Sequence, residues 1–87
     1  MSAACPAVSR RFRLQWEAVQ QSWVLLYPEG MVKLNGPAGE ILRRCDGTRP
    51  VEEIVRELEQ AFDTPGLHDD VCAFLEMAAR QQWVERA

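Results

Sequence analysis

The chain has 87 residues, and 10 Lys and Arg against 13 Asp and Glu give a formal net charge of −3 at pH 7. An apolar share of 47% is normal for a globular domain and argues against disorder, and the length suits one domain. The acidic balance argues against a nucleic-acid-binding domain, because such domains carry a clear surplus of basic residues on one face.

No apolar run approaches the roughly 18 residues of a membrane span. Residues 1–10 lack the apolar central region of a secretory signal. The three cysteines, Cys5, Cys45 and Cys72, form no CxxC pair, so the sequence predicts neither a zinc site nor a redox dithiol. We therefore expect a cytoplasmic protein that has no contact with a membrane and holds no cofactor or metal.

The first part of the chain predicts an arm and then a strand. Residues 1–10 are small and polar with one proline, which predicts a flexible N-terminal arm and a single domain over residues 11–87. Phe12, Leu14 and Trp16 then alternate with polar residues, as in an antiparallel strand that has one buried face.

Two further strands follow, over residues 22–27 and 31–34. The first is apolar on both faces, which fits either a central strand covered on each side or an outer face used for binding. Between them, Pro28-Glu29-Gly30 has the composition of a tight turn. Three strands joined by short turns form a meander, whose last strand, 31–34, would be an edge with unpaired N–H and C=O groups.

Helical signals fill the rest of the chain. Asn35 or Gly36 can cap a first helix, which Pro37 enters and Asp46-Gly47 ends. A second helix follows Pro50 and a third begins near Asp69-Asp70. Their apolar stripes are Ala38, Ile41, Leu42 and Cys45 in the first, Val51, Ile54, Val55, Leu58 and Phe62 in the second, and Val71, Phe74, Leu75 and Ala78 in the third.

Three strands followed by three helices predict an α+β fold, winged-helix-like, with a three-stranded antiparallel meander. No enzyme active site is predicted, because His68 is the only histidine and has no second histidine near it, and no Gly-rich phosphate loop is present.

The predicted edge at 31–34 could instead accept an extended peptide, with the third helix as the other wall of the groove. Val71, Leu75 and Ala78 would line that wall, although core packing is the commoner role of such a stripe.

The stretch Tyr27-Pro28-Glu29-Gly30-Met31-Val32-Lys33-Leu34-Asn35, together with Ile41-Leu42, Cys45-Asp46-Gly47 and residues 51–58, is similar to the PqqD family. These proteins are the peptide chaperones of pyrroloquinoline quinone biosynthesis. The resemblance extends over about residues 12–84. The sequence departs from the family pattern at Pro37, where the family often has Thr, and at Arg43-Arg44, where the family has a more apolar pair.

This resemblance implies a non-catalytic RiPP recognition element. Such a domain would bind the precursor peptide PqqA by strand addition at its third strand and present it to the radical-SAM enzyme PqqE. The iron–sulfur clusters and S-adenosylmethionine would belong to that enzyme. The implied peptide-binding residues are Met31, Val32, Lys33 and Leu34 on the strand and Val71, Leu75 and Ala78 on the third helix.

Two other functions stay open. A winged-helix DNA-binding regulator would insert its helical pair into a groove, but the third helix carries Asp69, Asp70 and Glu76 against only Arg80, which is a poor surface for phosphates. A structural module could form a homodimer through the same free edge, and this would compete with peptide binding.

Overall fold

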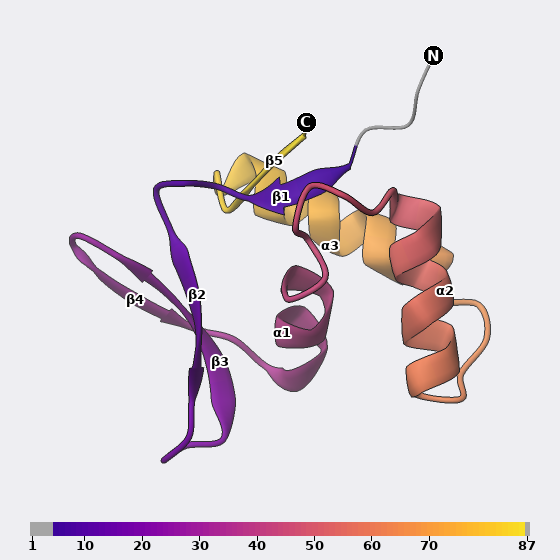
Figure 1. Ribbon diagram of the computed structural model, residues 1–87, viewed down its shortest axis with the longest axis horizontal. Coiled ribbons are helices and arrows are strands. Elements are labelled where there is room, and N and C mark those ends of the chain that lie inside the picture. Colours follow the sequence, from indigo (N-terminus) through magenta and orange to yellow (C-terminus); the bar gives the residue numbers. More distant parts are fainter. Residues whose placement is uncertain (1–4, 87) are drawn as a thin grey trace.

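The computed structural model describes residues 5–86, and Figure 1 shows a sheet on one side of three helices. The sheet is antiparallel with strand order β2-β3-β4. The elements are β2 (Arg13–Glu17), β3 (Ser22–Tyr27), β4 (Gly30–Lys33), α1 (Gly36–Leu42), α2 (Val51–Ala61) and α3 (His68–Arg80). This order confirms the predicted α+β fold, a three-stranded antiparallel meander followed by three helices. In the described part of the chain, no helix combines the length and the apolar character needed to cross a membrane.

A second, two-stranded sheet joins the two ends of the chain, where β1 (Pro6–Val8) pairs with β5 (Val84–Arg86). We expected residues 1–10 to form a flexible arm, so this strand is a difference from the sequence-based expectation for the residues described. Its cause is long-range hydrogen bonding: the Val8 N–H donates to the Cys45 carbonyl at 3.0 Å and the Ser9 N–H to the Trp83 carbonyl at 2.8 Å. Residues 1–4 lie outside the described part.

The first helix begins as the sequence predicts. The Asn35 side chain accepts the Ala38 N–H at 2.8 Å, so it satisfies one of the amides left free at the helix start. The helix ends at Leu42, before Cys45, yet Cys45 is buried with the rest of the predicted stripe. Gly47 follows with φ of +83°, and its N–H donates to the Pro6 carbonyl at 3.0 Å.

The core fills the space between the sheet and the helices. Leu25 of the central strand is fully buried on the helix-facing side, and Val24 is 1% exposed on the other side. Of the two alternatives for this strand, cover on both faces therefore describes Val24 and Leu25. Around Leu25 the cluster takes side chains from every helix, among them Leu42, Ile54, Leu58, Val71 and Leu75.

A buried arginine ties the first helix to the second. Arg44 is only 8% exposed, and its guanidinium donates to the Glu40 carboxylate at 2.9 Å and to the Glu57 carboxylate at 3.3 Å. Arg49 donates to the same Glu57 oxygen at 3.0 Å. Two opposite charges beside the buried Arg44 guanidinium offset part of its desolvation cost, and the two ion pairs link α1 to α2.

The contact between α1 and β3 depends on a residue without a side chain. A Cβ atom on Gly39 would lie 2.4 Å from Cδ1 and 2.8 Å from Cβ of Trp23. These atoms belong to the rigid near end of the indole side chain, so they cannot move aside without shifting the helix or the strand. Gly39 therefore sets how closely α1 approaches the sheet.

We predict that Gly39→Ala lowers the free energy of unfolding by about 1–3 kcal/mol, the usual cost of overpacking. Gly36→Ala is the matched control, because a Cβ there has no neighbour within 4 Å. Urea unfolding followed by circular dichroism compares the two variants. Equal stability of both would show that the close approach of α1 to Trp23 is not a feature of the protein.

Candidate peptide-binding site

Strand β4 forms one edge of the sheet, and its register decides which backbone groups are free. The Leu34 N–H donates to the Trp23 carbonyl at 3.0 Å, so this pair is hydrogen-bonded. Bonded and non-bonded pairs alternate along an antiparallel ladder. Val32, opposite Leu25, therefore also bonds to β3, whereas Met31 and Lys33 direct their N–H and C=O groups away from the sheet. This outward row is the free edge that the sequence predicts.

The side chains of this strand divide between the core and solvent. Leu34 is buried at 5% exposure and belongs to the core cluster, and Val32 is half-buried against it. Met31 is 53% exposed, and Lys33 is exposed beside it; both lie on the face of the sheet opposite to Val32 and Leu34. A peptide paired with β4 would therefore meet an apolar and a cationic side chain on the outer face.

Strand β2 is the other edge of this sheet, which the sequence analysis did not consider. By the same alternation, Gln15 bonds to Val24 of β3, and Leu14 and Trp16 direct their backbone groups outward. The structure therefore offers two free margins.

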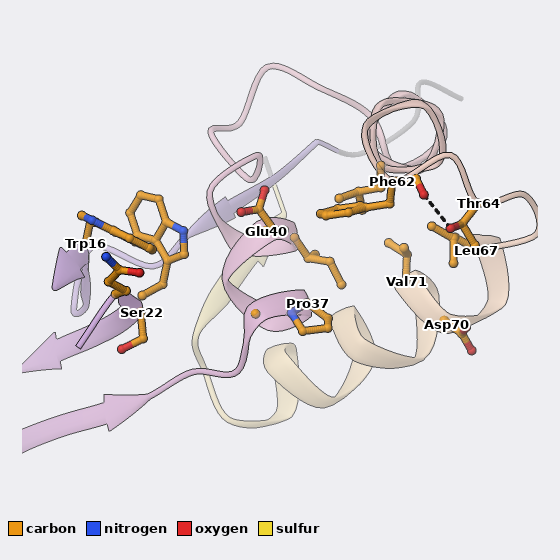
Figure 2. Close-up of a pocket in the computed structure, with 14 residues that line it drawn as sticks. Trp16, Ser22, Pro37, Glu40, Phe62, Thr64, Leu67, Asp70 and Val71 are labelled. Atoms are coloured by element: carbon orange, nitrogen blue, oxygen red, sulfur yellow. Dashed lines mark hydrogen bonds between the residues drawn. The ribbon is translucent and has the colours of Figure 1, made fainter. Parts of the chain in front are cut away.

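An apolar groove of about 580 Å³ lies between the sheet and the helices (Figure 2). Trp16 and Trp23 form its sheet side, and Phe62 and Leu67 form the opposite side, at the corner between α2 and α3. Pro37 of α1 lies between the two sides in the figure. The groove could not be predicted from the sequence, because its walls come from segments far apart in the chain.

Two aromatic side chains on the groove are much more exposed than core residues. Trp16 is 48% exposed and Phe62 is 51% exposed. Trp16 packs edge-on against Trp23, with ring centroids 5.3 Å apart. Phe62 was predicted to lie in the buried stripe of α2; this is wrong, because the helix ends at Ala61 and the next residue turns away from the core.

The three predicted residues of α3 are all buried. Val71 is 2% exposed and lines the groove, while Leu75 and Ala78, at 2% and 0%, lie in the core cluster. Core packing, the commoner role named for this stripe, therefore describes their free state. A direct peptide contact of Leu75 or Ala78 stays a prediction and requires α3 to shift from this position.

One titratable group among the described residues has a strongly shifted pKa. Burial raises the pKa of the Cys45 thiol to about 12, so this thiol stays protonated and unreactive at neutral pH. His68 has Asp69 beside it and lies 3.6 Å from the sulfur of Cys72, a neighbour that the sequence analysis overlooked. Within residues that the structure describes, no group of three metal-ligating side chains occurs.

The comparisons with known proteins agree with this fold. Residues 22–84 match the profile of a family described as coenzyme PQQ synthesis protein D (PqqD). The chain belongs to the PqqD family. The resemblance inferred from the edge strand and first helix is thereby confirmed.

Curated relatives in this family are named PqqA binding proteins. One from Pseudomonas aeruginosa strain UCBPP-PA14 is 53% identical over 81 residues, which cover 92% of this chain and 88% of the relative. One from Klebsiella pneumoniae is 49% identical over 79 residues, with 90% and 86% covered.

A solved structure shares the architecture. It is the solution NMR structure of the PqqD truncation of Methylobacterium extorquens PqqCD, described as a functional, stand-alone RiPP recognition element. The TM-score is 0.76 at 30% sequence identity, with 93% of this chain and 88% of that chain covered.

We predict that amide hydrogen exchange alternates along β4 in the free protein. The Met31 and Lys33 amides should exchange rapidly, because they have no partner in the described sheet, and the Val32 and Leu34 amides should be protected. Two-dimensional NMR after transfer into D₂O measures all four. Protection of Lys33 equal to that of Val32 would show that the margin is already covered, by a second copy or by the chain itself.

Proposed function

We propose that this protein is a non-catalytic chaperone that binds the precursor peptide PqqA by strand addition along β4. The observation that carries the proposal is the outward row of backbone groups on Met31 and Lys33, in a family whose curated relatives are named PqqA binding proteins. Exposed strand edges pair readily with an extended chain, and the main-chain hydrogen bonds supply affinity that is independent of the peptide sequence.

Strand addition alone gives modest affinity. Each backbone hydrogen bond contributes a net of about 0.5–1.5 kcal/mol. Selectivity for one precursor therefore needs side-chain contacts, for which Met31 and Lys33 on the outer face and Val32 and Leu34 on the helix-facing side are the nearest groups. Of the three residues predicted on α3, Val71 is the one that lines the groove.

The proposal includes delivery of the peptide to the radical-SAM enzyme PqqE. A peptide bound as an added edge strand is contacted on one side only, so its own outer edge and many of its side chains remain accessible to an enzyme. The cofactors of the reaction would belong to the enzyme.

A homodimer through the same margin is the second candidate. The free groups of β4 and the 53% exposed side chain of Met31 favour it, because an unprotected edge can pair with a second copy. Such pairing would occupy the peptide site, so dimer and complex would exclude each other.

We predict that Lys33→Pro weakens binding of synthetic PqqA at least tenfold, which is about 1.4 kcal/mol. Proline removes the outward donor at residue 33, and an edge position whose N–H faces solvent tolerates proline within the sheet. Isothermal titration calorimetry measures the affinity.

Lys33→Ala is the matched control, because it removes the same side chain and keeps the amide. It should bind more tightly than Lys33→Pro, and thermal unfolding of both variants checks that the fold is intact. If the folded Lys33→Pro variant binds PqqA as tightly as Lys33→Ala, strand addition at β4 is excluded.

A further inference from the structure

We propose that the apolar groove is a second contact site for the same precursor peptide, which inserts an aliphatic or aromatic side chain there with a Lys or Arg next to it. The inference rests on the proposed function and adds a second site to the β4 margin. It concerns a surface, walled by Trp16, Trp23, Phe62 and Leu67, to which neither the sequence nor the relatives' names assign a role.

The chemistry of the walls favours a large apolar side chain. A volume of about 580 Å³ lies within the range of roughly 300–1,000 Å³ that is typical of ligand pockets. Trp16 and Phe62, on opposite sides of the groove, leave about half of their surface in water, and a side chain placed between them would remove that surface from solvent. Aromatic side chains are enriched at interfaces, and contiguous exposed apolar patches often mark binding sites.

The charges at the groove favour a cation beside that side chain. The charged residues that line it are Glu40 and Asp70, both acidic. Glu40 is already paired with Arg44 at 2.9 Å and with Arg43 at 3.4 Å. Asp70 is exposed in the first turn of α3 and forms no ion pair within residues 5–86, so it is available to a Lys or Arg from outside.

The position of the groove favours the peptide as its occupant. Gly36 and Pro37 line the groove and follow Lys33 by three and four residues. Three to four residues of extended chain span about 10–13 Å. Val71, predicted from the family resemblance to contact the peptide, also lines it. A peptide that leaves β4 at Lys33 and continues past the start of α1 would therefore reach the groove within a few residues.

The test is a titration of synthetic full-length PqqA into Phe62→Glu. This change places a charge where the apolar side chain would insert, and we expect the affinity to fall at least tenfold. The matched control is Val19→Glu, because Val19 is apolar and 91% exposed on the β2–β3 loop but does not line the groove; its affinity should stay unchanged. Both positions are exposed, so the fold is expected to tolerate either glutamate.

A second pair of variants tests the cation. Asp70→Asn should weaken binding severalfold at low salt and less at high salt, whereas Asp69→Asn, one residue earlier and outside the groove, should not. In the same titration, the indole N–H signals of Trp16 and Trp23 should shift, and that of Trp83, outside the groove, should not.

The outcomes separate the two proposals. If the unmodified protein does not bind PqqA at all, the proposed function fails. If it binds, and Phe62→Glu and Val19→Glu bind equally well, the groove is not a peptide site and this inference is overturned. If Phe62→Glu leaves the affinity unchanged but alters the sedimentation coefficient, the groove is an interface between copies, which overturns it as well.

Discussion

The register of β3 against β4 is the constraint on which the proposed peptide site depends. The turn at Pro28-Glu29 pairs Tyr27 with Gly30, and from that point the ladder alternates between bonded and outward-facing residues. A slip of one residue would turn Val32 and Leu34 to solvent and bring Met31 and Lys33 into the core. The burial of Leu34 and Val32 in the core therefore also fixes which amides a peptide can reach.

The contacts between the helices and the sheet position the walls of the groove. Trp23 lies against Gly39, so α1 approaches the sheet closely, and the Arg44 ion pairs hold α1 beside α2. The corner after α2 then faces Trp16 across the groove. The edge and the groove are thus positioned by different contacts, and a change to one need not disturb the other.

Much of the fold could be predicted because its signals are local: the strand expected from residues 12–17, the Pro28–Gly30 turn and the Asn35 cap are all present. The buried face expected of that strand is wrong at Trp16, which is 48% exposed. The sheet of β1 and β5 could not, because each strand has three residues and its partner lies at the other end of the chain. The groove was missed for a related reason, since separate segments build it. The sequence alone does not tell whether the Lys33 amide or the Val32 amide points away from the sheet. That follows only from the register of β4 against β3.

Observation of the peptide backbone beside β4 would test the account most directly. In a complex of isotope-labelled protein with unlabelled PqqA, we expect interstrand nuclear Overhauser effects from the Met31 and Lys33 amides to backbone protons of the peptide, because paired antiparallel strands bring these protons close together. If these effects instead connect the peptide to Leu14 and Trp16, or to no strand edge at all, the claim that β4 accepts the added strand is contradicted.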